Sequence, residues 1–410
     1  MNKVQAFFKS YADSEEQLDY RMAHETLGEK TPAISTGSYI LDEALSAGGL
    51  PKGRLIQYYG VSGSGKTLMS IIAISEAQKE DPTALQVFID AEGTFDPSWA
   101  EILGADTSKI ILIDGDMAVN GRKCFEMILG VPKEDGKTHI LKGKSKLGLI
   151  DNIINKEINI NLIILDSLGA IIPPGEDTSA VGKANISLLS RFLTNTFRKL
   201  TLDLKKAKVP FIIINHKKDN MDPYGADHTF SGGNTYSHFL SANVYFEAVQ
   251  RKDSVILDEK ENKIGHPIRA TIEKSKFGPW PRKCEFKVNF GIGVVDKHEE
   301  VAELALTYNV VKKTSTVAHE YKENKWIGFN KYCEALKENK VLTDQILAEI
   351  LVARELKLEN KRKEQQNKLS ILPVLSVDNL EQENIENSEQ SETIEVTEDV
   401  VKRGRKPNVK

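Results

Sequence analysis

The sequence has no long apolar segment and little cysteine. None of its 410 residues belongs to an apolar run of about 18, the length that a membrane-spanning helix needs. Its start, MNKVQAFFKSYADSEEQ, lacks the apolar stretch and the small-residue cleavage site of a secretory signal. The three cysteines, Cys124, Cys284 and Cys333, lie far apart and in no metal-ligand spacing. We therefore expect a cytoplasmic protein that has no membrane contact and no disulfide framework.

The chain also lacks an excess of one charge over most of its length. Its formal net charge is -4, and residues 376–410 alone hold nine acidic and five basic residues. The rest of the chain is therefore neutral, so its overall field cannot steer a polyanion. Any contact with nucleic acid must come from a local basic patch.

Regular patterning fills the central part of the chain. From residue 33 to about 297, apolar runs of strand length alternate with helical patterns, which predicts an α/β core with a mainly parallel sheet covered by helices. The longest helix is expected from Asn185 to Lys206. Around this core we expect a helical arm at 1–32, a small helical C-terminal domain at 298–358, and a disordered acidic tail with a basic end at 359–410.

The basic, Gly-rich stretch at 131–149 lacks strong periodicity. We interpret it as a surface insertion, and contact with DNA is the alternative interpretation.

The clearest motif is GVSGSGKT, which follows an expected strand at Arg54–Tyr59 and precedes an expected helix at Leu68–Gln78. In this setting backbone N–H groups and the helix N-terminus bind phosphates, Lys66 reaches the outer phosphates, and the Thr67 hydroxyl binds Mg²⁺. The structural alternative is a Gly-rich strand-to-helix turn that binds nothing. The motif predicts an ATP and Mg²⁺ site that includes Gly60, Ser62, Gly63, Ser64, Gly65, Lys66, Thr67 and Leu68.

Three further strand-like runs end in polar side chains, at Asp90 and Glu92, at Asp166, and at His216. The carboxyl ends of parallel strands share one edge of the sheet, where open α/β sheets bind ligands. Asp166 suits the magnesium carboxylate of a P-loop ATPase, with a helix N-cap as its structural alternative. Glu92 is the expected base that orients and deprotonates a water molecule. Asp90 is its rival, and a purely structural role for either residue is the alternative.

Taken in order, these segments resemble the bacterial RecA recombinases over about residues 33–297. The resemblance implies a RecA-like P-loop ATPase that forms a helical filament on single-stranded DNA, pairs it with duplex DNA and promotes strand exchange in recombination and repair. The matching segments are Ile34–Arg54, Gly60–Thr67, Phe88–Glu92, Asp96–Pro97, Leu165–Ser167, Arg191, Arg198–Leu200, Ile214–Asn215, Gly232–Asn234 and Lys274–Lys276.

The resemblance also implies roles for single residues. Glu92 takes the place of the water-activating base, and Trp99 that of an aromatic ring that stacks on adenine, with Asp96 nearby. Lys274 and Lys276 match a lysine pair that reaches across the subunit interface to the neighbour's nucleotide. Without the resemblance, both lysines look like solvated strand residues.

At His216 the chain departs from the family, which has a Gln there as the sensor between the γ-phosphate and a DNA-binding loop. Phage recombinases of the UvsX type have Asn-His at this place, so we expect a phage-type member. A structural histidine is the alternative.

Two polar segments, Pro173–Lys183 and Lys217–Ser231, coincide with the DNA-binding loops of the family. Phosphate contacts there predict sequence-tolerant binding of single-stranded and duplex DNA. Single-strand binding and mediator proteins are candidate partners. Tyr224 and Phe230 are candidates for stacking on bases, and residues 402–407 resemble an AT-hook, although a solvated basic terminus explains them equally well. The candidate DNA-binding residues are Arg191, Arg198, Lys217, Lys218, Gly232 and Gly233.

Three other functions share parts of this pattern. A hexameric RecA-fold helicase has the same P-loop and glutamate but assembles as a ring that unwinds DNA. A recombination mediator binds ATP and DNA with little turnover, which the set of Lys66, Thr67, Glu92 and Asp166 argues against. A small-molecule kinase has a P-loop but does not respond to DNA.

Overall fold

The computed structural model describes residues 31–132, 144–176, 186–219, 228–233, 235–249, 251 and 255–370. The chain divides into two compact units, one up to Asp344 and one from Gln345 onward. The expected helical arm up to residue 30, Tyr224 and the basic motif at 402–407 lie outside the described residues.

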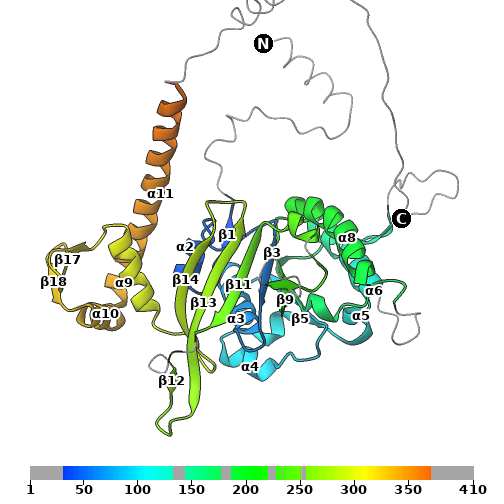
Figure 1. Ribbon diagram of the computed structural model, residues 1–410, viewed down its shortest axis with the longest axis horizontal. Helices are drawn as coiled ribbons and strands as arrows, with labels where there is room; N and C mark the ends of the chain where they lie inside the picture. Colours follow the sequence, from blue (N-terminus) through cyan, green and yellow to red (C-terminus); the bar gives the residue numbers. More distant parts are fainter. Residues whose placement is uncertain are drawn as a thin grey trace, which may run out of the picture. The chain divides into compact units, whose positions relative to one another are not determined.

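A large mixed sheet forms the centre of the first unit (Figure 1). Among the described residues it has 11 strands, and its main path runs β15-β14-β13-β11-β3-β9-β8-β4-β5. The six strands from β11 to β5 are parallel, whereas β13, β14 and β15 continue the sheet antiparallel. The predicted α/β core with a mainly parallel sheet is confirmed. The strands are β3 (Leu55–Gly60), β4 (Leu85–Asp90), β5 (Ile110–Ile113), β8 (Ile160–Asp166), β9 (Phe211–Asp219), β10 (His228–Phe230), β11 (Ala242–Ala248), β12 (Ile256–Leu257), β13 (Lys263–Ser275), β14 (Arg282–Asn289) and β15 (Gly293–Val294).

Helices cover both faces of this sheet. The central strands β3, β8 and β9 are apolar and buried along most of their length, as expected for parallel strands between two helical layers. Helix α3 (Lys66–Glu80) packs on the face that carries Ile56 and Ile212. Helix α8 (Ile186–Ala207) packs on the opposite face and matches the long helix expected at Asn185–Lys206.

Shorter elements complete the core and close the insertion. β6 (Val131–Pro132) and β7 (Lys144–Lys146) pair antiparallel at the two ends of the expected insertion, and residues 133–143 lie outside the described part. The other elements are β1 (Ala33–Ile34), α2 (Tyr39–Ala44), β2 (Leu50–Pro51), α4 (Pro97–Ile102), η2 (Thr107–Lys109), α5 (Gly115–Val119), α6 (Gly121–Leu129), α7 (Leu149–Ile154), η3 (Leu168–Ala170) and η4 (Thr235–Phe239).

The region after the core holds a small sheet that the sequence pattern does not predict. Between α9 (Lys297–Thr307) and α10 (Phe329–Glu338), the strands β16 (Lys312–Lys313), β17 (Ala318–Tyr321) and β18 (Asn324–Ile327) pair antiparallel. Tyr321 pairs with Asn324, so residues 322–323 form a two-residue hairpin loop in which Lys322 has a φ of 53°. Strands this short hold too few residues to show a clear alternation of apolar and polar side chains, which is why a purely helical unit was expected.

Helix α11 (Lys340–Ser370) continues past residue 359, where a disordered tail was expected. The reason is that Glu, Lys, Arg, Gln and Leu favour helix even where few apolar residues are available for packing. Residues 371–410 lie outside the described part. No helix among the described residues has the length and apolar character needed to cross a membrane.

Candidate nucleotide-binding site and DNA-binding loops

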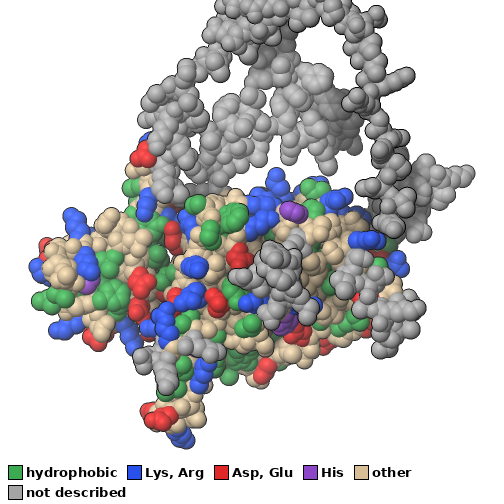
Figure 2. All heavy atoms as spheres, in the orientation of Figure 1, with side chains coloured by type: hydrophobic (Ala, Val, Ile, Leu, Met, Phe, Trp, Pro, Cys, Tyr) green, Lys and Arg blue, Asp and Glu red, His purple; other side chains and the backbone are tan. Residues whose placement is uncertain are grey.

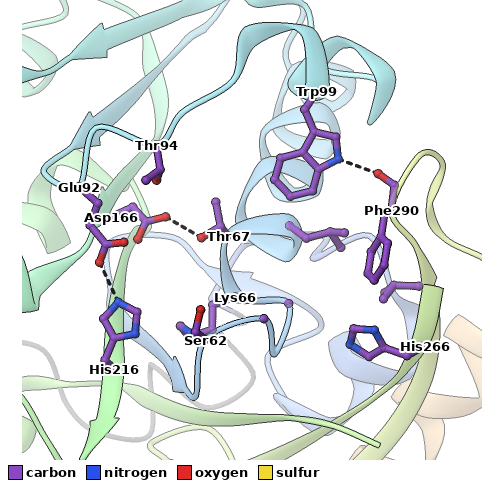
Figure 3. A pocket seen from close by; sticks show the side chains of 14 residues that line it. Ser62, Lys66, Thr67, Glu92, Thr94, Trp99, Asp166, His216, His266 and Phe290 are labelled. Carbon is purple, nitrogen blue, oxygen red and sulfur yellow. Dashed lines mark hydrogen bonds and ion pairs between the residues drawn. The ribbon is translucent and has the colours of Figure 1, made fainter. Parts of the chain in front are cut away.

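The carboxyl ends of four parallel strands bring the predicted residues to one rim of the sheet. Gly60 at the end of β3 is in register with His216 on β9, and Asp90 at the end of β4 is in register with Asp166 at the end of β8. A cavity of about 320 Å³ opens at this rim (Figure 3). Its lining residues are Ser62, Gly63, Gly65, Lys66, Thr67, Leu68, Glu92, Thr94, Trp99, Asp166, His216, His266, Val288 and Phe290.

The P-loop forms the floor of this cavity and leads into α3. Gly65 precedes the helix with a φ of 94°, and a Cβ there would lie 2.2 Å from Ile268 Cδ1, so only glycine fits. Lys66 is buried, and its Nζ donates to the carbonyls of Gly60 (3.2 Å) and Val61 (2.8 Å). Burial lowers the pKa of Lys66, although Asp166 and Glu92 favour its charged form. The helix N-terminus and this ammonium group suit an anion such as a triphosphate.

Thr67 and Asp166 provide oxygen ligands that fit Mg²⁺. The Thr67 hydroxyl donates to Asp166 Oδ2 over 2.7 Å, and Asp166 is buried beside it. Burial raises the pKa of Asp166 to about 6, and the hydrogen bond from Thr67 opposes that rise. A hydroxyl and one carboxylate beside a phosphate site are the protein ligands that Mg²⁺ commonly uses.

Glu92 lies at the centre of a hydrogen-bonded group. Its Oε1 accepts from the Ser167 hydroxyl and lies 2.7 Å from His216 Nε2. Burial alone would raise the pKa of Glu92, but the hydrogen bonds from Ser167 and His216 and the charges of His216 and Lys66 together hold it below its ordinary value. An ionised carboxylate at this place can accept a hydrogen bond from a water molecule at the phosphate site. Ser167 was missed as a site residue, although it directly follows Asp166 in the sequence.

Asp90, the rival to Glu92, has a different environment. Its two carboxylate oxygens accept from the backbone N–H groups of Gly93 and Phe95, each over 2.8 Å, and the side chain is 4% exposed. Both oxygens are therefore used to shape the turn that carries Glu92. The geometry favours Glu92 over Asp90 as the residue that faces substrate.

The other half of the cavity has aromatic and apolar walls. Trp99 Nε1 donates to the Phe290 carbonyl over 2.6 Å, and Leu68, Val288 and His266 complete this side. In Figure 3 Trp99, Phe290 and His266 lie across the P-loop from Glu92 and His216. The strands β13 and β14 deliver His266, Val288 and, just beyond the end of β14, Phe290, none of which belongs to a recognisable motif.

Three expected nucleotide ligands do not line the cavity. Asp96 caps α4, because its Oδ1 accepts from the N–H groups of Ser98 (2.8 Å) and Trp99 (3.3 Å). Ser64 is fully buried and Gly60 ends β3, so both shape the loop from beneath.

Lys274 and Lys276 lie at the opposite end of the sheet from the P-loop. Lys274 is in register with Asn243, which pairs with Gln57 near the start of β3. Its Nζ donates to the Ser237 carbonyl over 2.5 Å, and Lys276 is exposed. Neither lysine lines the cavity of its own chain.

The second expected DNA-binding loop begins as a β-hairpin. β9 continues past His216 and pairs with β10, so that Lys217 faces Phe230 and Lys218 faces Thr229 across the pair. Lys218 is exposed, whereas the Lys217 ammonium lies 5.4 Å from the centre of the Tyr245 ring. Residues 220–227 of this expected loop, and residues 177–185 of the first expected loop, lie outside the described residues.

The base of this hairpin lies against the start of α8. A Cβ at Gly232 would lie 2.6 Å from Leu193 Cδ1, and one at Gly233 would lie 3.6 Å from Ser190 Oγ. Arg191 and Arg198 are exposed on α8, and a spacing of seven residues puts them on one helix face. Lys and Arg side chains lie over α8 in Figure 2.

Phe230, proposed as a stacking residue, is 8% exposed. Its ring packs edge-on against Tyr59 and Tyr236, at centroid distances of 5.4 and 5.6 Å. It is therefore part of the core and does not present its face to a base.

A buried polar network joins the cavity to this hairpin. Asn215, next to His216, donates to the Ser231 carbonyl (3.0 Å) and to the Tyr236 hydroxyl (2.8 Å). Tyr236 in turn donates to Gln57 Oε1 over 2.5 Å. These groups are all buried, so the hydrogen bonds of Asn215 connect β9 beside His216 with the base of the hairpin.

Comparison with known proteins agrees with this arrangement. The family model described as the RecA N-terminal domain matches residues 20–134 and 138–295. Protein RecA of Helicobacter pylori (strain HPAG1) is 31% identical over 324 residues, which cover 78% of this chain and 84% of the relative. Protein RecA of Helicobacter hepaticus is 30% identical over the same length. The mitochondrial DNA repair protein recA homolog 3 of Arabidopsis thaliana is 27% identical over 365 residues, which cover 86% of this chain and 76% of the relative.

The family match spans the parallel sheet, the P-loop and the strands β13 and β14 that close the cavity. Together with the relatives it shows that this chain belongs to the RecA family.

Proposed function

We propose that this protein is a DNA-dependent ATPase and recombinase that assembles as a helical filament on single-stranded DNA, pairs it with homologous duplex DNA and promotes strand exchange. The observation that carries the proposal is the contact between Glu92 and His216. It joins an acid at the phosphate site to the strand that continues into the DNA-binding hairpin. The names of the relatives, Protein RecA and a DNA repair protein, support the same assignment.

Hydrolysis follows from the groups around the P-loop. Lys66 and the N-terminus of α3 would bind the phosphates, and Thr67 and Asp166 would hold Mg²⁺. When bound, Mg²⁺ neutralises charge that develops on the phosphate oxygens. Glu92 orients a water molecule in line with the γ-phosphate and accepts its proton as the oxygen attacks phosphorus, and the bond from phosphorus to the bridging oxygen breaks so that ADP leaves.

Coupling to DNA begins at His216. Its Nε2 lies 2.7 Å from Glu92 Oε1. A γ-phosphate competes for that nitrogen and releases Glu92 for its water. The accompanying shift of β9 passes through Asn215 to Ser231 at the base of the hairpin. ATP binding thus favours the state that grips DNA, and hydrolysis releases it.

The position of Lys274 and Lys276 supports assembly as part of the mechanism. Because they cannot reach the nucleotide of their own chain, any role in hydrolysis requires a neighbouring subunit. Positive charge supplied by a neighbour stabilises the transferring phosphoryl group, as an arginine finger does. DNA binding, assembly and hydrolysis then depend on one another.

The test combines turnover with imaging. ATP hydrolysis by the full chain is measured with and without single-stranded DNA, and the complex with a non-hydrolysable ATP analogue is viewed by electron microscopy. We expect DNA-stimulated hydrolysis and open helical filaments. Closed rings with unwinding activity would assign the protein to the helicases. A rate of ATP hydrolysis that does not change when single-stranded DNA is added would contradict the proposal altogether.

A further inference from the structure

The cavity contains one buried polar side chain that the ATPase mechanism does not use. His266 on β13 is 3% exposed and lines the cavity beside Phe290 (Figure 3). Its ring meets that of Phe290 at 66° with the centroids 5.4 Å apart. Among the residues that the structure describes, neither Nδ1 nor Nε2 has a hydrogen-bond partner.

Such burial has an energetic cost. A polar group that is buried without a partner destabilises the fold, and an apolar side chain at the same place would avoid that cost. The neighbours on the same sheet face, Ile268 on β13 and Val288 in register on β14, are apolar and buried. A bound molecule that hydrogen-bonds the ring would offset the cost of burying it and would explain why a histidine occupies this position.

The charge state of the ring limits what that partner is. Burial lowers the pKa of His266, and the nearby charge of Lys263 lowers it further. Near neutral pH the ring is therefore uncharged, with one nitrogen as donor and the other as acceptor. A neutral ring suits a neutral group that carries both donors and acceptors, and it does not suit a phosphate.

The position of His266 matches that chemistry. It lies on the aromatic side of the cavity with Trp99 and Phe290, across the P-loop from Glu92 and Asp166. Flat aromatic walls suit a flat ring, and the edge of a nucleobase carries the donors and acceptors that a neutral imidazole can pair with. Phe290, which shields the imidazole, is itself 37% exposed on the turn before β15, so the shield is a surface side chain.

We propose that His266 hydrogen-bonds the edge of the nucleobase and thereby positions the nucleotide over the P-loop. This inference rests on the proposed function as an ATPase and adds a residue to its binding site. His266 is a positioning residue that touches the base and takes no part in the transfer of the phosphoryl group.

The test is a set of binding measurements by calorimetry on the full chain. The ligands are ATP, 2′-deoxyATP and inorganic tripolyphosphate, each with Mg²⁺, and the variant is His266→Phe. We expect the variant to bind ATP and 2′-deoxyATP roughly tenfold more weakly than the wild type, and tripolyphosphate equally well. His266→Gln, which keeps a donor and an acceptor, should restore most of the lost affinity.

His319→Phe is the matched control. His319 is also 3% exposed with an unpartnered Nδ1, but it lies on β17 and does not line the cavity. We expect this variant to bind all three ligands like the wild type. If His266→Phe does not fold, as judged by thermal unfolding, His266→Met replaces it because methionine fits irregular spaces.

Each other outcome has one meaning. Equal ATP affinity in the variant and the wild type overturns the inference and leaves the proposed function intact. A loss confined to ATP would point to the sugar hydroxyl, and an equal loss for tripolyphosphate would point to the phosphates, so either overturns the base contact. A wild-type protein that binds none of the three ligands would refute the proposed function itself.

Discussion

In the proposed mechanism, Glu92 is the residue on which hydrolysis depends. Three side chains from three elements converge on or near its carboxylate: Ser167, His216 and Lys66. Asp90, two residues earlier, is committed to the backbone of the following turn. The sequence leaves Glu92 and Asp90 as rival candidates for the base, and their hydrogen-bond partners distinguish between them.

The first prediction concerns Glu92→Gln. The amide has nearly the same shape but accepts no proton, so we expect ATP binding to persist and DNA-stimulated hydrolysis to fall by about 10²- to 10⁴-fold. Binding is measured by calorimetry and turnover by phosphate release. Glu126→Gln on α6, whose side chain is 42% exposed and does not line the cavity, serves as the control and should be unaffected. Hydrolysis at the wild-type rate in Glu92→Gln would remove Glu92 from the mechanism.

A second prediction tests the sensor role of His216. In His216→Ala the link between the phosphate site and β9 is lost, so ATP should no longer strengthen binding to single-stranded DNA. His216→Gln retains a donor of similar reach, and it should keep part of the effect. The readout is the ratio of DNA affinities with and without a non-hydrolysable ATP analogue. An unchanged ratio in His216→Ala would favour a structural histidine.

At the scale of elements, α9 holds α2 through a buried carboxylate. Glu300 on α9 accepts from the Ser38 hydroxyl (2.9 Å) and from the Tyr39 N–H (2.7 Å) at the start of α2. Burial raises the pKa of Glu300 to about 7 from an ordinary value of 4.5. The folded protein therefore holds this proton more tightly than the unfolded chain does.

The third prediction is the pH dependence that follows. Stability from this proton is fully present below pH 4.5 and is lost as the pH rises through about 7, by up to about 3 kcal/mol. Asp42, whose pKa burial raises to about 6, adds to the same trend. Denaturant unfolding of Glu300→Gln between pH 4.5 and 7 should show a flatter curve than the wild type. Glu334→Gln, exposed on α10, is the control, and equal slopes for Glu300→Gln and wild type would contradict the assignment.

At the scale of the whole molecule, the two groups of residues with a proposed role in hydrolysis lie at opposite ends of the sheet. The phosphate site lies at the carboxyl ends of the parallel strands, and the lysine pair lies at the other end. A complete site therefore requires two subunits if the lysines act in hydrolysis.

The fourth prediction uses this division. A Lys274→Ala, Lys276→Ala double variant should bind ATP but lose DNA-stimulated hydrolysis by about 10³-fold or more. Mixed with Glu92→Gln, which supplies intact lysines, it should regain activity in filaments that contain both proteins. Lys260→Ala, on an exposed turn, is the control. A mixture no more active than its separate components would mean that the lysines do not act across an interface.

A fifth prediction concerns DNA affinity. Phosphate contacts by Arg191 and Arg198 should make log Kd for single-stranded DNA depend on log salt, with a slope of about 0.7 per phosphate neutralised. Arg191→Ala should reduce the slope by about that amount on any base sequence. Arg122→Ala on α6 should leave it unchanged. A strong preference for particular bases would argue against backbone recognition.

The sequence alone determined the phosphate half of the site, and the physical reason is local. Gly60–Thr67 is a continuous segment, and Glu92, Asp166 and His216 each follow a strand end, so parallel pairing was enough to bring them together. In the other half, Trp99 and Leu68 were expected from the sequence, and only the tertiary structure added the rest. His266 and Phe290 come from antiparallel strands whose register depends on packing against β11 and α3, and no spacing along the chain encodes that register. Packing likewise directed both oxygens of Asp90 to backbone N–H groups and placed Lys274 and Lys276 at the end of the sheet away from the cavity.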